Sequence, residues 1–151
     1  MSEYKIDVTV LPNSQKGEVE YRLMLEDKVA CYLRIKQTNL ILTLSTDFMR
    51  LVDNGLMTFD YVISQNENYN IYSIDYIGVP DNLRRQGYAT ILLSHVINLY
   101  KDKEIYLMVE PMGIDYDILV RFYSKYNFKI LSEWENYGKE KRNIMYRKPS
   151  L

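Results

Sequence analysis

The sequence contains very little cysteine and histidine. It has one cysteine, Cys31, and one histidine, His95. A single cysteine excludes a disulfide within the chain, and without a cluster of histidines or cysteines nothing in the sequence supports a metal site. Cys31 lies among alternating apolar residues, where a thiol is most simply a small core residue. His95 lies at the rim of a helical apolar stripe, and we interpret it as structural.

Long apolar runs and a strong excess of charge are also missing. No window approaches the roughly 20 apolar residues of a membrane span. The first residues contain no apolar signal core, so we expect a cytoplasmic protein without a membrane partner. The net charge of −1 argues against broad contact with nucleic acid. With 151 residues, 47% of them hydrophobic, we predict a single domain over residues 1–151, as a monomer or a homodimer.

Alternation of apolar and polar residues, the pattern of strands, is what the chain has in abundance. It predicts strands over residues 4–10, 19–25, 29–36, 71–79, 104–110, 128–134 and 142–147. Apolar residues at three- and four-residue spacing predict helices over 89–100 and 116–126, the second capped by Asp115. A further strand, helix and strand are expected between residues 40 and 63. Together these elements predict an α/β domain of the α+β kind with a central sheet.

One stretch, residues 79–89, joins a buried strand to an apolar helix through a basic loop. The first N–H groups of a helix have no internal partners and carry partial positive charge, so they accept phosphate readily. Arg84 and Arg85 add guanidinium groups, and Gly87 allows a ligand to approach the backbone. The loop has neither the Gly-Lys-Ser/Thr of a Walker loop nor the three glycines of a dinucleotide fingerprint. The alternative is an ordinary solvated turn.

The pattern Arg84-x-x-Gly87-x-Ala89 resembles the acyl-CoA loop of the GCN5-related N-acetyltransferase (GNAT) superfamily. A second stretch, residues 119–128, resembles the family's later helix, which is usually written Leu/Phe-Tyr, three residues, Gly-Phe. Here Asn127 replaces the glycine. The resemblance runs from about residue 71 to 148 and implies a central mixed, mostly antiparallel sheet flanked by helices. It also implies an acyl-CoA site where two neighbouring strands splay apart.

The resemblance assigns acetyl-CoA as the acyl donor and gives each part of it a place. Main-chain groups around Ile77 and Val79 would bind the pantetheine arm. The pyrophosphate would be held by the loop and helix start, which comprise Arg84, Arg85, Gln86, Gly87, Tyr88 and Ala89. Tyr123 matches the family's tyrosine near the cofactor sulfur, where it can donate a proton. The alternative for Tyr123 is a packed core aromatic.

No motif marks the general base that acyl transfer to an amine needs. Asp75 and Glu110 are the candidates, because both lie near the predicted splay. A solvated carboxylate is the alternative for each, and a base acting through water is a further possibility.

The predicted function is an N-acetyltransferase that moves an acetyl group from acetyl-CoA to a primary amine of a protein or small molecule. The alternative is a non-catalytic GNAT-fold binding or inhibitor protein that keeps the fold and CoA binding. Residues 11–19 leave no room for the two helices that usually follow the family's first strand, and residues 37–64 look like an insertion. The acceptor side of the site is therefore not predicted.

Overall fold

The computed structural model describes residues 3–10, 18–38, 71–78, 87–109, 115–136 and 140–150. The chain divides into two compact units that alternate along the sequence. Unit one comprises Met1–Gln37 and Ile74–Lys101, and unit two comprises Thr38–Ser73 and Asp102–Leu151. The expected organisation of residues 1–151 as a single domain stays a prediction.

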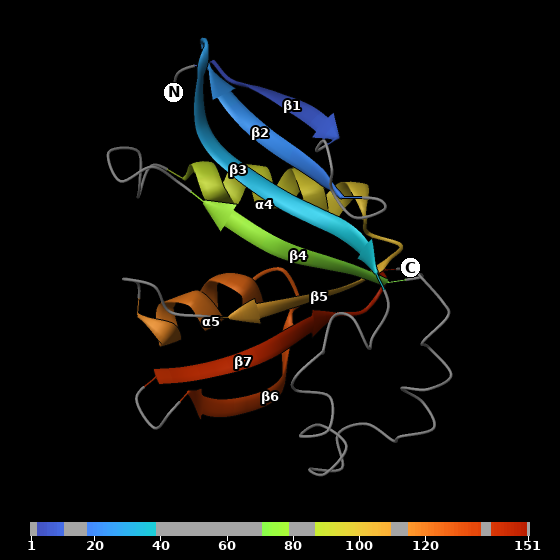
Figure 1. Cartoon of the computed structure of the whole chain (residues 1–151), viewed down its shortest axis with the longest axis vertical. Helices are drawn as coiled ribbons and strands as arrows, with labels where there is room; N and C mark the ends of the chain where they lie inside the picture. Colours follow the sequence, from blue (N-terminus) through green and yellow to red (C-terminus); the bar gives the residue numbers. More distant parts are fainter. Residues whose placement is uncertain are drawn as a thin grey trace. The chain divides into compact units, whose positions relative to one another are not determined.

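Unit one contains four strands in the order β1-β2-β3-β4 and one helix (Figure 1). The strands are β1 (Lys5–Val10), β2 (Val19–Leu25), β3 (Lys28–Thr38) and β4 (Ile71–Gly78), whose first residues belong to unit two, and the helix is α4 (Tyr88–Leu99). Strand β2 pairs antiparallel with both β1 and β3. Helix α4 lies across one face of these strands (Figure 1).

The core of unit one lies between α4 and the apolar face of the sheet. On β2 and β3, Leu23 is paired with Cys31 and Tyr21 with Leu33, and all four side chains are buried. From the helix, the buried residues are Tyr88, Leu92, Leu93, Val96 and Ile97. Each fully buried aliphatic side chain contributes about 1.5–3 kcal/mol. The burial of Cys31 confirms its interpretation as a core residue.

One polar contact joins the helix end to the sheet in unit one. The hydroxyl groups of Tyr21 and Tyr100 lie 2.8 Å apart, and the two rings meet edge-on. The ring of His95 lies 6.3 Å from that of Tyr21, also edge-on. These contacts place the face of β2 that carries Tyr21 against α4 and support a packing role for His95.

Unit two contains three strands in the order β5-β7-β6, with β7 antiparallel to both neighbours, and the helix α5. The elements are β5 (Glu104–Val109), α5 (Tyr116–Ser124), β6 (Lys129–Asn136) and β7 (Glu140–Arg147). Its buried residues include Ile105, Leu107, Tyr123, Phe128 and Met145. The terminal hairpin predicted from alternation is therefore present.

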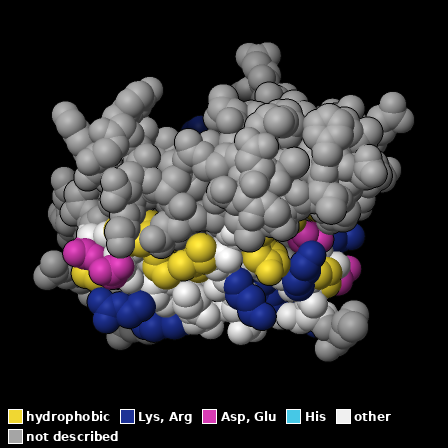
Figure 2. All heavy atoms as spheres, turned by 90° about the horizontal axis from the view of Figure 1, so that it is seen from below, with side chains coloured by type: hydrophobic (Ala, Val, Ile, Leu, Met, Phe, Trp, Pro, Cys, Tyr) yellow, Lys and Arg dark blue, Asp and Glu magenta, His cyan; other side chains and the backbone are white. Residues whose placement is uncertain are grey.

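Exposed hydrophobic side chains occur in both units. Among the described residues they are Tyr4, Val8 and Leu99 in unit one, and Ile118 and Ile130 in unit two. Figure 2 shows one face of the molecule, on which hydrophobic side chains lie beside Lys and Arg side chains. In the described parts of the chain, no helix is long and apolar enough to cross a membrane, and no three potential metal ligands cluster.

The strands and two helices confirm the predicted α/β fold class. The three- and four-residue spacing puts Leu99 on the apolar face of the first predicted helix, and this was wrong: Leu99 lies at the end of α4 and is 51% exposed. Ile97, one turn after Leu93, is buried instead. The strand, helix and strand expected between residues 40 and 63 lie outside the described residues.

Candidate functional site

The predicted anion site includes the start of α4, in unit one. Strand β4 ends at Gly78 and α4 begins at Tyr88, with Gly87 as the capping residue. Gly87 has φ 82°, a left-handed conformation in which a residue with a Cβ is strained. The predicted residues Val79, Arg84, Arg85 and Gln86 lie outside the described residues.

The N-terminus of α4 has the features of a helix end that receives an anion. The helix is regular from its start, since the N–H of Ile91 donates to the carbonyl of Gly87 at 3.1 Å. In the described part of the chain, no side chain caps this end, and its first turn has no acidic residue. A Cβ built on Gly87 would meet no described atom within 4 Å. The helix dipole therefore favours negative charge here, and no described atom fills the space beside Gly87.

The other described residues of this predicted site differ in how far their side chains are buried. The side chain of Tyr88 is buried and that of Ala89 is half-buried. Both side chains are used in packing, so their contribution to a ligand would come from the backbone. Ile77, near the end of β4, is also half-buried. The role predicted for it in binding pantetheine would likewise use main-chain atoms.

Tyr123 lies in unit two, near the end of α5. The helix starts as predicted, because the Asp115 carboxylate accepts a hydrogen bond from the N–H of Asp117 at 2.8 Å. It ends before Asn127, whose φ of 67° is the left-handed conformation expected of the residue that replaces glycine. Arg147 of β7 holds this end, since its Nε donates to the carbonyl of Tyr126 at 3.0 Å.

Aromatic side chains surround Tyr123 and exclude water from it. The centres of the Phe122 and Phe128 rings lie 5.2 and 6.0 Å from that of Tyr123, both edge-on. Only 7% of Tyr123 is exposed. Burial raises the pKa of its hydroxyl from 10.0 to about 12. The hydroxyl is therefore protonated at neutral pH and can donate a hydrogen bond.

Of the two candidate bases, Asp75 lies within the described residues and Glu110 does not. The carboxylate of Asp75, on β4, lies 3.2 Å from the ammonium group of Lys36 on β3. This ion pair gives Asp75 a structural partner within unit one. Glu110 follows the last residue of β5 and lies outside the described residues. Both stay predictions, as does a joint site formed with Tyr123.

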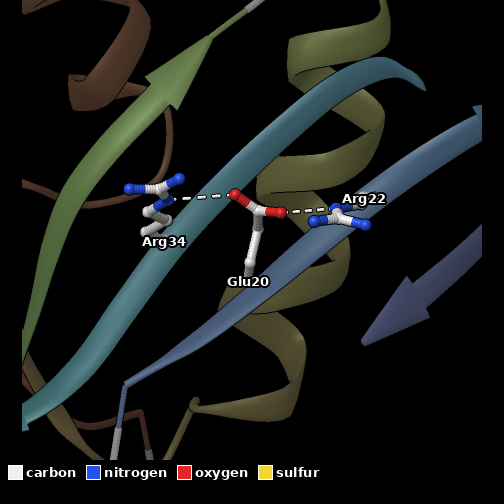
Figure 3. A network of polar contacts seen from close by, with 3 residues as sticks. All are labelled: Glu20, Arg22 and Arg34. Atoms are coloured by element: carbon white, nitrogen blue, oxygen red, sulfur yellow. Dashed lines mark hydrogen bonds and ion pairs between the residues drawn. The ribbon is translucent and has the colours of Figure 1, made fainter. Parts of the chain in front are cut away.

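A buried carboxylate that the alternation pattern did not single out lies on β2. Glu20 is 4% exposed and accepts hydrogen bonds from Arg22 of β2 and from Arg34 of β3 (Figure 3). The Arg34 bond measures 2.9 Å. Burial alone would raise the pKa of Glu20, but the bonds from the two arginines outweigh it and lower the pKa below its ordinary value of 4.5. Alternation with Val19 and Tyr21 puts Glu20 on the polar face of β2, and this pattern alone does not predict its burial.

Comparison with solved structures shows which fold these elements form. The ribosomal-protein-S18-alanine N-acetyltransferase of Escherichia coli superposes with a TM-score of 0.61, covering 92% of this chain and 74% of that enzyme at 17% identity. The chain has the GNAT fold. Its elements thus follow the order that the sequence resemblance implied.

Two plant GNAT structures contain cofactor or an analogue of it. Arabidopsis thaliana NAA60 was solved with acetyl-CoA and gives a TM-score of 0.53 at 14% identity, covering 87% of this chain and 76% of that one. Arabidopsis thaliana Naa50 was solved with the bisubstrate analogue CoA-Ac-MVNAL and gives 0.55 at 16% identity, covering 85% and 72%. No protein-family model and no curated protein sequence matches the chain. The GNAT likeness therefore resides in the fold.

Proposed function

We propose that this chain is an acetyl-CoA-dependent N-acetyltransferase that acts on a primary amine. The observation that carries the proposal is the GNAT fold over 92% of the chain, shared with an N-acetyltransferase. The start of α4 adds chemical support, because its N-terminus, which no described side chain caps, and Gly87 suit a pyrophosphate. Acetyl-CoA is the proposed donor because related folds were solved with acetyl-CoA or a CoA-containing analogue.

The proposed reaction forms a carbon–nitrogen bond and breaks a carbon–sulfur bond. A neutral amine attacks the thioester carbonyl, and the electron pair of the broken bond leaves on sulfur as a thiolate. The proton lost by the amine goes to a base, for which Asp75, Glu110 and a water molecule are the candidates. Asp75 would first have to part from Lys36, so Glu110 is the carboxylate to substitute first.

Tyr123 is proposed to stabilise the departing thiolate. The raised pKa of its hydroxyl decides whether it does so by transferring its proton or by donating a hydrogen bond. An ordinary thiol has a pKa of about 8.5, whereas that of Tyr123 is about 12. Full transfer of the tyrosine proton to sulfur would therefore be uphill by about 5 kcal/mol. A hydrogen bond from the hydroxyl to the thiolate has no such penalty. We therefore assign Tyr123 the role of a hydrogen-bond donor, with the thiolate reaching protonation through solvent.

The test is amine-dependent release of CoA, followed by detection of its free thiol. Peptide amino termini form the first set of acceptors, because related folds are named for a ribosomal-protein alanine or were solved with an MVNAL peptide analogue. Lysine side chains, polyamines and small amines form the second set. We expect thiol release above the hydrolysis background with at least one class. Binding of CoA without turnover on any amine would instead indicate the non-catalytic alternative.

A further inference from the structure

Strand β1 forms one edge of the described sheet. It pairs with β2, and no other described strand follows it in the strand order. Its side chains are exposed: Tyr4, just before the strand, is 46% exposed and Val8 is 54% exposed. The side chains of Lys5 and Asp7 are 72% and 47% exposed. An edge strand presents a row of backbone N–H and C=O groups that a further strand can bind.

The two faces of β1 carry different chemistry. Val8 is paired with Tyr21, the residue that contacts α4, so the even-numbered residues lie on the α4 side of the sheet. Tyr4 and Ile6 line an open groove of about 470 Å³ together with Ile91 of α4 and neighbouring polar residues. Lys5 and Asp7 lie on the opposite face and form an ion pair of 3.9 Å.

The sequence of β1 is complementary to its own antiparallel copy. In an antiparallel pair related by a two-fold axis at Ile6, Tyr4 lies opposite Val8, and Lys5 lies opposite Asp7. Each pair occurs twice, because residue i faces residue j and residue j faces residue i. Both exposed apolar residues then gain an apolar partner, and both charges gain an opposite charge.

Neighbouring registers lack this complementarity. An axis at Lys5 would place the two lysines opposite each other, and an axis at Asp7 would place the two aspartates opposite each other. Like charges directly opposite each other in a sheet are destabilising. Edge strands that avoid association commonly carry charged side chains, lysine above all, or proline. The charges of β1 alternate in sign and select one register.

We infer that β1 is the dimerisation edge of this chain and that its partner is a second copy bound through antiparallel β1–β1 pairing centred on Ile6. The two sheets would become continuous, and Val8 of the second copy would lie beside Tyr4 at the open side of the groove. This inference does not depend on the proposed acetyl transfer. It rests on the exposure, register and charge of four side chains of one segment.

The test is a charge exchange across the proposed axis, read by sedimentation of the full chain over a range of concentrations. We expect wild type to show a reversible monomer–dimer equilibrium. In Asp7→Lys, each of the two pairs across the axis joins a lysine to a lysine. In Lys5→Asp, each of the two pairs joins an aspartate to an aspartate. Because each change converts two attractive pairs into repulsive ones, each should weaken the dimer by about 10- to 100-fold. The double variant Lys5→Asp/Asp7→Lys restores both pairs and should restore the dimer.

Controls separate dimerisation from folding and from net charge. Lys5 and Asp7 are exposed, so the single variants should keep the melting temperature that monomeric wild type has at low concentration. Asp102→Lys makes the same charge change at an exposed turn after α4 and should leave the dimer unchanged. A chain that stays monomeric at every concentration would overturn the inference. So would a dimer that tolerates both single variants.

Discussion

Replacing Gly87 by alanine should separate backbone strain from ligand binding. Gly87 has φ 82°, where an L-residue is disfavoured by about 1–2 kcal/mol. Alanine also reduces the conformational freedom of the unfolded chain, which offsets about 0.4–1 kcal/mol. A Cβ would meet no described atom within 4 Å, so the described residues add no steric overlap. The net loss is about 1 kcal/mol, which lowers the melting temperature of a chain of this size by about 2–4 °C.

The same methyl group would occupy the space where a phosphate approaches the backbone at the start of α4. Loss of one charge-assisted hydrogen bond is worth about 1.5–3 kcal/mol, so CoA should bind about 10- to 100-fold more weakly. Calorimetric titration measures this directly. Acetyl-pantetheine, which carries the same thioester without the pyrophosphate, is the matched control ligand, and its affinity should not change.

Gly87→Asn is the matched variant for strain. Asparagine tolerates the left-handed conformation and is a favoured capping residue, so its melting temperature should fall less than that of the alanine variant. Its side chain still fills the space beside the backbone, and CoA binding should still weaken. If Gly87→Ala lowers the melting temperature as expected but binds CoA with wild-type affinity, the turn does not hold the pyrophosphate.

Three further predictions concern single side chains. Tyr123→Phe should lower kcat by about 10- to 100-fold, because that is the rate effect of losing a hydrogen bond to a charged group, and should leave the affinity for CoA unchanged. The control variant Tyr126→Phe should change neither kcat nor CoA affinity. An unchanged kcat in Tyr123→Phe would contradict the role assigned to Tyr123. Glu20 stabilises the fold above its ordinary pKa of 4.5 and loses this effect as the pH falls through its lowered folded-state pKa. Glu20→Gln should therefore cost about 1–2 kcal/mol in denaturant melts at pH 7 and progressively less as the pH is lowered below 4.5; a loss that does not change with pH would contradict the ion-pair explanation. Because burial raises the pKa of Cys31 to about 12, a thiol reagent should label it only after unfolding, and rapid labelling of the native protein would refute this.

Most of the correct predictions from the sequence depend on interactions between residues that are close together in the chain. Asp115 caps a helix because a short carboxylate reaches a free N–H, and Asn127 takes a left-handed backbone because its side chain tolerates it. Both depend on neighbours within a few residues. Alternation of apolar and polar residues placed Cys31 on the apolar face, and this prediction also depends only on neighbouring residues. The order of elements in the GNAT fold followed from such local patterns in sequence.

The burial and the partners of Glu20 could not be predicted from local sequence patterns. Continuing the register of Leu25 with Lys28 would place Glu20 opposite Leu33, but a bulge between Leu23 and Met24 shifts the pairing by one residue and places it opposite Arg34. The sequence does not mark this bulge. The cluster of Glu20, Arg22 and Arg34 therefore depends on a feature of strand pairing that appears only in three dimensions. The end of β4, Gly87 and the start of α4, which mark the predicted anion site, are local features of the sequence, and anion binding there stays a prediction.

Arg147 has a consequence for how α5 moves. A helix of nine residues is too short to be stable alone, and its end is tied to β7 by the bond from Arg147 to the Tyr126 carbonyl. The backbone of Phe128 also donates to the carbonyl of Tyr123, at 3.4 Å. Displacement of β7 would break the bond from Arg147, whereas the bond from Phe128 is local to the end of α5. Amide protons of α5 should therefore exchange with solvent together with those of β7, and the lifetime of the terminal hairpin sets how long Tyr123 stays in place.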